Sequence, residues 1–135
     1  MTSNDDNLLK QLIEAENSHD VEKVLTLLTD DIVFEDVTLV TEGKDAFKQG
    51  YTAFITAVPD FKIEPKSWVT SDRSFALEMV FTGTQKGDLP SLPATGKSFS
   101  IRGCSFGEFE NGKIKGRRDY WDSASLAKQL VGEPK

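Results

Sequence analysis

One aspartate in this sequence, Asp119, is a candidate for proton transfer, because a carboxylate can accept and return a proton. Residues 113–121 (KIKGRRDYW) have the composition of a β-strand. Because successive side chains of a strand point to opposite faces, the face that carries Asp119 is expected to carry Lys115, Arg117 and Trp121 as well. Aromatic walls and the exclusion of water disfavour the charged form of a carboxylate, which suits such a group to acid/base catalysis near neutral pH.

A second aspartate, Asp36, stands near the end of a short stretch, residues 32–37, that is rich in β-branched and aromatic side chains. At the mouth of a cavity it could work opposite Asp119 as a pair of acids. An aldol-type cyclisation needs a group that takes a proton from an activated carbon and returns one to a carbonyl oxygen, and one aspartate can serve both steps. The alternative for Asp119 is a structural ion pair with an arginine: Arg102, Arg117 or Arg118.

Two aromatic residues with polar atoms, Tyr51 and Trp68, could line a ligand pocket or a subunit interface. Their O–H and N–H groups need a hydrogen-bond partner when they are buried. With the residues on the Asp119 face, they give a set of candidate substrate-binding side chains: Tyr51, Trp68, Arg117 and Trp121. Most phenylalanines are instead expected to form the core, namely Phe34, Phe47, Phe54, Phe75 and Phe81.

Metal chemistry finds little support in the sequence. The one histidine, His19, lies in a polar link, residues 17–20, and is expected to be a solvated turn residue. The one cysteine, Cys104, has no partner at ligand spacing and no partner for an internal disulfide, so we expect a small buried hydrophobe. We therefore expect no metal site and no cofactor.

The charge balance argues against several classes of partner. Sixteen basic against twenty-two acidic residues give a net charge of −6, the wrong sign for holding a phosphate backbone. No apolar run approaches the roughly 18–20 residues that span a bilayer. The polar, acidic start MTSNDDN lacks the pattern of a signal peptide. We expect a cytoplasmic protein that binds neither nucleic acid nor membrane.

The hydrophobic pattern predicts helices first and strands later, within a single domain of residues 1–135. Apolar residues at helical spacing predict helices over about 6–17, after the N-cap Asp20, and over about 44–57. Four strands are then expected to pair antiparallel: 61–69, 74–84, 98–110 and 113–121. This order predicts an α+β fold, in which a curved antiparallel sheet wraps around three N-terminal helices and leaves a concave internal pocket for a small molecule.

Two further segments complete the pattern. A long Gly/Pro-rich loop, residues 85–97, is expected to be either a lid or binding loop, or a rigid turn at a dimer contact. After the last strand, Asp122 or Ser123 is expected to cap a final short helix.

Motifs along nearly the whole chain resemble those of the SnoaL-like polyketide cyclases and related ester cyclases, which share the nuclear-transport-factor-like, ketosteroid-isomerase-type fold. The matching stretches occur in the family's order: NSHD (17–20), EGKDAF (42–47), VPDF (58–61), FTGT (81–84), LPSLPATGK (89–97), RGCSF (102–106), ENGKI (110–114) and DYWDSASLAKQLVG (119–132). The resemblance implies a cone-shaped sheet with an internal pocket, a homodimer formed through the sheet face, and an acid/base aspartate on the last strand, which Asp119 matches.

Comparison with ketosteroid isomerase implies a catalytic base at Asp36 and turns the Asp119 face toward the cavity. The second acid of the isomerase falls near Ser105 and its tyrosine near Leu12, and neither residue can replace the group it matches. Ser105 is kept as a candidate pocket residue. Gln85 stands where SnoaL-like relatives often have a histidine.

Three functions follow from these patterns. The first is a cofactor-independent cyclase or isomerase that acts on an apolar, carbonyl-bearing compound through Asp119 and Asp36. The second is a non-catalytic ligand-binding or accessory protein, which the polar groups missing at Leu12, Gln85 and Ser105 favour. The third is an assembly domain whose exposed sheet face binds a partner.

Overall fold

Three helices lie in the N-terminal half of the chain, with two strands between the second and the third, and they form as their apolar spacing predicts. The computed structural model describes residues 4–37, 39–90 and 92–132. The helices are α1 (Asn4–Ser18), α2 (Val21–Thr26) and α3 (Lys44–Ala57). Asp20 caps α2, because its carboxylate accepts a hydrogen bond of 3.1 Å from the backbone N–H of Lys23. The bounds of α3 are those predicted.

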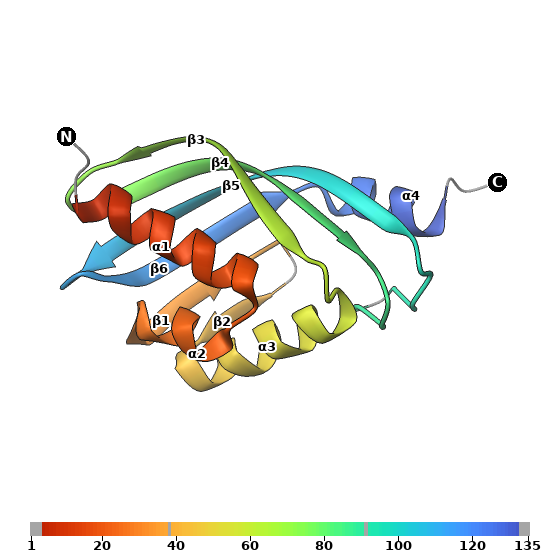
Figure 1. Ribbon diagram of the computed structural model, residues 1–135, viewed down its shortest axis with the longest axis horizontal. Helices are drawn as coiled ribbons and strands as arrows, with labels where there is room; N and C mark the ends of the chain where they lie inside the picture. The colour runs from red at the N-terminus through yellow and green to blue at the C-terminus, as the bar shows by residue number, and fades with distance from the viewer. Residues whose placement is uncertain (1–3, 38, 91, 133–135) are drawn as a thin grey trace.

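The strands form one six-stranded, curved sheet, with the order β2-β1-β6-β5-β4-β3 (Figure 1). Its strands are β1 (Leu28–Glu35), β2 (Val40–Glu42), β3 (Lys62–Thr70), β4 (Ser74–Thr84), β5 (Ser98–Glu110) and β6 (Lys113–Trp121). A last helix, α4 (Ser123–Val131), is capped by the side chain of Asp122. The predicted α+β class is confirmed.

Two features of the sheet differ from the prediction. β1 begins at Leu28, before the predicted residues 32–37, and pairs with β6 in parallel, so the sheet is not wholly antiparallel. The short strand β2 was not predicted, and it extends the edge beyond β1. Parallel pairing needs partners far apart in sequence, which a local pattern does not reveal.

A β-bulge corrects the predicted face of Lys115. Gly116 pairs with Glu108 and Ile114 with Phe109, so Lys115 has no partner on β5. The extra residue reverses the alternation at this point, and Lys115 lies on the outer face of the sheet while Arg117 lies on the inner face. The prediction that Lys115 shares the face of Asp119 is therefore wrong.

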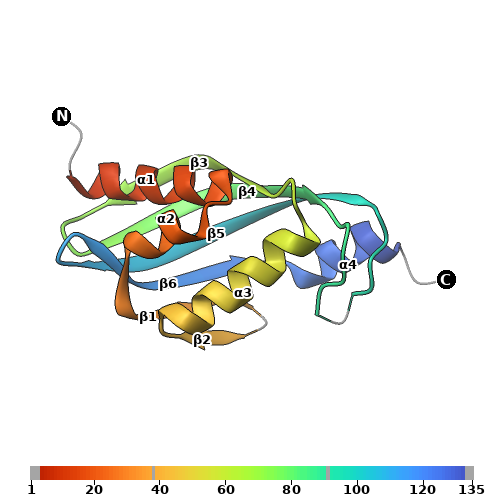
Figure 2. The same ribbon diagram turned by 60° about the horizontal axis from the view of Figure 1, so that its bottom comes forward.

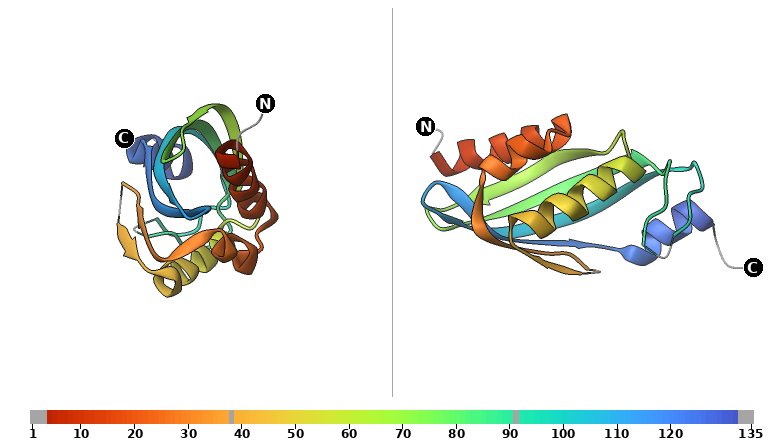
Figure 3. Two further views of the ribbon diagram at one scale, coloured as in Figure 1. Left: turned by 90° about the vertical axis from the view of Figure 1, so that its left-hand side faces the viewer. Right: turned by 90° about the horizontal axis from the view of Figure 1, so that it is seen from below.

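The concave side of the sheet holds the core. The end-on view of Figure 3 shows the sheet curling into an unclosed cone with α1 and α3 along its open side. In Figure 2, α3 runs diagonally across β1 and β2. Buried apolar side chains from both layers meet there, among them Leu12, Ile32, Phe47, Leu77 and Ile114. Burial of this apolar area is the main favourable term in folding.

Hydrogen bonds connect the polar link, residues 17–20, to the start of β3. The amide side chain of Asn17 donates to the carbonyl oxygen of Ile63 at 2.9 Å and accepts from its N–H at 2.7 Å. His19 is half-buried with a φ of 61°, and its Nε2 lies 2.7 Å from the carbonyl oxygen of Phe61. The expectation that His19 is merely solvated is wrong, because it ties the link to the start of β3.

The 85–97 segment is organised around Gln85, whose side chain is fully buried. Its Nε2 donates to the carbonyl oxygen of Leu92 at 2.7 Å, and its Oε1 accepts from the hydroxyl of Thr95 at 3.0 Å. The side chain of Gln85 thus connects Leu92 and Thr95 from inside the loop. Cys104 is half-buried on the outer face, so the expected fully buried position is wrong.

Two glycine-to-alanine variants test the packing of the inner face. A methyl group at Gly107 would lie within 3.0 Å of both the Phe75 ring and the backbone oxygen of Gly116, whereas one at Gly50, within α3, meets nothing. We expect Gly107→Ala to lower the free energy of unfolding by about 1–3 kcal/mol. Gly50→Ala should raise it by about 0.5–1 kcal/mol. Urea denaturation measures both, and equal effects would contradict this packing.

Candidate functional site

Asp119 and Arg117 form a two-bonded ion pair on the inner face of β6. Nε of Arg117 donates to Oδ1 of Asp119 at 2.9 Å, and Nη2 donates to Oδ2 at 3.2 Å. Both residues are buried, with exposed fractions of 5% and 6%. The fork of a guanidinium matches the two oxygens of a carboxylate, which makes this geometry specific as well as strong.

Glu16 brings a second carboxylate to the same guanidinium. It lies in α1 with an exposed fraction of 4%, and its Oε1 accepts a hydrogen bond from Nη1 of Arg117. The sequence interpretation missed Glu16. The signal was present, because the apolar spacing of Leu9, Leu12 and Ile13 continues to position 16, where a carboxylate interrupts the buried stripe.

Neutral side chains complete the surroundings of Arg117. Its Nε also donates to the hydroxyl of Ser105 at 3.2 Å, and Ser105 is fully buried. Its Cζ lies 5.7 Å from the ring centroid of Phe34, a distance at which cation and ring attract. Phe34 in turn meets the ring of Phe47 edge-on. We call the three ionisable residues, Glu16, Arg117 and Asp119, the buried charge cluster.

The cluster holds one positive group between two carboxyl groups. Burial raises the pKa of Glu16, the charge of Arg117 works against this, and the charge of Asp119 adds to it. Burial lowers the pKa of Arg117, but Asp119 and Glu16 together raise it above its ordinary value. Arg117 therefore stays charged. Because two carboxyl groups share this one positive charge, either one of them holds a proton or the buried negative charge in excess destabilises the fold.

Tyr51 holds the helices together beside this cluster. Its hydroxyl donates to the backbone oxygen of Glu16 at 2.7 Å, which joins α3 to α1. Burial, followed by the charge of Glu16, raises the pKa of Tyr51. The partner expected for its polar atom is thus backbone, and the phenol fixes the position of Glu16.

Asp36 lies one residue beyond the end of β1 and is half-buried. Its backbone N–H donates to the carbonyl oxygen of Leu39 at 2.9 Å. The parallel register pairs Phe34 with Arg117, so two further residues along each chain lead to Asp36 and Asp119. Asp119 therefore lies on β6, and Asp36 follows the end of the neighbouring strand β1.

The two tryptophans lie in different surroundings. Trp121, at the end of β6, is partly buried against the core. Trp68 lies on the edge strand β3 with an exposed fraction of 51%. The structure therefore places Trp121, Arg117, Ser105 and Tyr51 toward the interior and leaves Trp68 at the rim.

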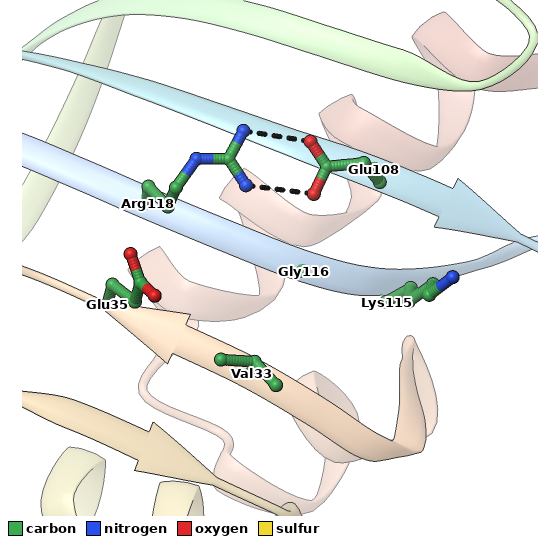
Figure 4. Close-up of a pocket in the computed structure, with 6 residues that line it drawn as sticks. All are labelled: Val33, Glu35, Glu108, Lys115, Gly116 and Arg118. Atoms are coloured by element: carbon green, nitrogen blue, oxygen red, sulfur yellow. Dashed lines mark hydrogen bonds and ion pairs between the residues drawn. The ribbon is translucent and has the colours of Figure 1, made fainter.

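Two shallow hollows open on the outer face of the sheet. One, of about 190 Å³, lies between β1, β5 and β6 (Figure 4), where Arg118 makes two hydrogen bonds of 2.9 and 2.8 Å to Glu108. The other, of about 240 Å³, lies over β3, β4 and β5 beside Phe106. Large side chains fill the concave side, so the predicted internal pocket stays a prediction.

Within residues 4–37, 39–90 and 92–132, no group of three or more His, Cys, Asp or Glu side chains is arranged to hold a metal ion. Across the same part of the chain, no helix combines the length and the apolar character needed to cross a membrane.

The fold and the sequence together define a family. A sequence model of the SnoaL-like polyketide cyclases matches residues 6–130. This chain therefore belongs to the SnoaL-like polyketide cyclase family, as its motifs predicted. No curated protein matches the chain in sequence.

Solved structures agree with this fold. A proposed polyketide cyclase from Xanthomonas campestris pv. campestris has a TM-score of 0.86 at 19% identity, with 95% of this chain and 99% of that chain covered. AclR of Streptomyces galilaeus, a proposed hydroxylase, has a TM-score of 0.81 at 22% identity, with 95% and 96% covered. A Catenulispora acidiphila protein with a ketosteroid isomerase-like fold has a TM-score of 0.80 at 13% identity, with 92% of each chain covered.

Removal of Arg117 tests whether the cluster depends on its one cation. Arg117→Met leaves two carboxyl groups buried without their counterion, and we expect it to lower the free energy of unfolding at pH 7 by about 3–5 kcal/mol. Arg118→Met is the matched control, because its ion pair is partly exposed, at 34% and 43% for the two side chains, and should cost about 1 kcal/mol or less. Urea denaturation distinguishes them. Similar losses would show that Arg117 is no more important than a surface arginine.

Proposed function

We propose that this chain is a cofactor-independent enzyme that acts on an apolar, carbonyl-bearing compound, with Asp119 as the aspartate that moves a proton. The observation that carries the proposal is the buried charge cluster on the concave face. Removal of each charged group from water costs several kcal/mol, and hydrophobic packing would be the more economical way to fill a core. Perturbed, buried ionisable groups concentrate at functional sites.

The chemistry proposed is an aldol-type ring closure. Asp119 takes a proton from the carbon next to a carbonyl group, and the resulting enolate attacks a second carbonyl carbon to form a C–C bond. The new alkoxide receives one proton, so the ring-closed product has the same atoms as the substrate. The charge of Arg117 lies where it offsets negative charge as it develops. Asp36, which follows the end of the neighbouring strand, is proposed as a second carboxyl group at the mouth of the proposed pocket.

The side chains proposed to contact the substrate are Ser105, Arg117, Trp121 and Tyr51. All four belong to the concave side, and the last two have the amphipathic character that suits contact with an apolar ligand. The proposal requires the side chains of this filled interior to part when a ligand enters. Trp68 does not join this group, because it lies at the rim of the sheet.

Asp119→Asn tests the catalytic role, because the amide cannot accept the proton. Exchange of the acidic hydrogens of a 1,3-dicarbonyl compound into D2O, followed by NMR, reports proton abstraction without knowledge of the natural substrate. We expect the variant to lose the protein-catalysed exchange by about 10²–10⁴-fold. Asp31→Asn, at an exposed position of β1, should retain it. An Asp119→Asn protein as active as the wild type, or a wild type no faster than buffer, would refute the proposed enzyme.

A second candidate function, assembly, is favoured by the outer face of the sheet. Val69, Phe106 and Tyr120 are exposed there by 69%, 40% and 49%, and the rings of the last two lie 6.1 Å apart. Charges of both signs lie beside them, at Arg118 and Glu108. A face that combines an apolar strip with both signs of charge can pair with its own copy, so we propose a homodimer through this face.

Light scattering after size-exclusion chromatography tests the dimer. A carboxylate on the apolar strip would be desolvated without a partner, so Phe106→Glu should convert a dimer to a monomer. Val131→Glu, at a 62% exposed position on α4 and outside the apolar strip, is the matched control and should leave the mass unchanged. A wild type that elutes as a monomer at high protein concentration would overturn the proposal.

A further inference from the structure

Glu16 differs from Asp119 in the way that the shared arginine holds it. Both oxygens of Asp119 accept from Arg117, which makes Asp119 the full counterion of the guanidinium. In contrast, Arg117 donates to a single oxygen of Glu16, Oε1. The other oxygen, Oε2, makes no hydrogen bond to Arg117, and it is the oxygen on which a proton would lie.

The charges in the cluster make that proton necessary. If both carboxyl groups were ionised, the buried cluster would hold a net charge of −1 in a site where three residues are at most 6% exposed. One proton makes the cluster neutral, and a buried neutral acid avoids most of the cost of desolvation. The proton belongs on the carboxyl group with the weaker hold on Arg117, which is Glu16.

The ionisable groups that face Glu16 come from two other elements. Arg117 and Asp119 lie on β6 and act in opposite directions on the pKa of Glu16. Tyr51, on α3, donates to the backbone of Glu16 and thereby fixes the end of α1. Burial outweighs the attraction of Arg117, and this agrees with the geometry.

We propose that Glu16 is the proton-carrying acid of this site and the acid partner of Asp119. Two carboxyl groups with opposed environments divide the roles of acid and base between them. In the ring closure, Asp119 takes the proton from carbon and Glu16 gives its proton to the alkoxide oxygen. The site is restored when Asp119 loses its proton to water and Glu16 takes one up as the product leaves. This catalytic half rests on the function proposed above, whereas the proton on Glu16 does not.

The protonation of Glu16 is measured directly by the ¹³C chemical shift of its side-chain carboxyl group across a pH titration. Glu16→Gln assigns the resonance, and Glu14→Gln, at an exposed position two residues earlier on α1, is the matched control. We expect Glu16 to titrate above the ordinary range of glutamate. A midpoint within that range would overturn the proposal.

The pH dependence of stability gives a second test that needs no resonance assignment. The folded protein keeps the proton of Glu16 at pH values where the unfolded chain, whose glutamates titrate near pH ~4.3, has lost it. Stability contributed by this group therefore falls as pH rises above ~5 toward the folded pKa. We expect this fall in the wild type and in Glu14→Gln, and a shallower one in Glu16→Gln. Parallel curves of stability against pH for the three proteins would overturn the proposal. Every variant retains His19, so any contribution of His19 is the same in all three curves.

Ring closure, rather than hydrogen exchange, tests the catalytic half of the proposal, because Glu16 donates to the alkoxide and Asp119 alone abstracts the proton from carbon. Glu16→Gln should therefore retain the exchange of the 1,3-dicarbonyl probe. In the intramolecular aldol closure of 2,6-heptanedione, Glu16→Gln should be slower than Glu14→Gln by about 10²-fold or more at pH values below the Glu16 midpoint of the wild type, and equal rates would overturn the catalytic role. If Glu16 titrates above the ordinary range and the wild type catalyses neither reaction, the proton on Glu16 is supported. The same result would overturn the catalytic role of Glu16 and the proposed enzyme.

Discussion

The interior of this protein depends on one guanidinium group that has to satisfy two carboxyl groups. Arg117 donates to Glu16 from one side and to Asp119 from the other, and all three side chains are almost fully buried. A buried charge without its partner costs far more than the pair contributes. The positions of α1 and β6 relative to each other are therefore constrained by charge as well as by apolar packing.

Several local features serve this constraint. The bulge at Lys115 sets the alternation of β6 so that Arg117 and Asp119 face inward. Opposite Arg117, the sheet carries Gly107, where a side chain would collide with Phe75. Tyr51 fixes the backbone of Glu16 from α3. Each feature is unremarkable alone, and together they hold the cluster in one arrangement.

The family motifs serve mainly to join segments. Asp60 of the VPDF stretch accepts from both the N–H and the hydroxyl of Thr84, at 2.7 and 2.8 Å, and these bonds hold the pKa of Asp60 below its usual range. Gln85 then organises the following loop through its own amide. These contacts explain why such motifs specify the fold while saying little about the reaction, which is set by the side chains that a relative places in its interior.

The sequence by itself determined the secondary structure and the family. Local periodicity was enough to predict the bounds of α3, β4, β5 and β6, because spacing of apolar residues depends on near neighbours. It also placed Asp119 and Arg117 on one face. Only the tertiary structure decided that β1 joins β6 in parallel, that Lys115 turns outward, and that Arg117 meets Glu16, which lies 101 residues away in the chain. Contacts over such distances are set by how the sheet curls around its helices, and no local pattern of residues contains that information.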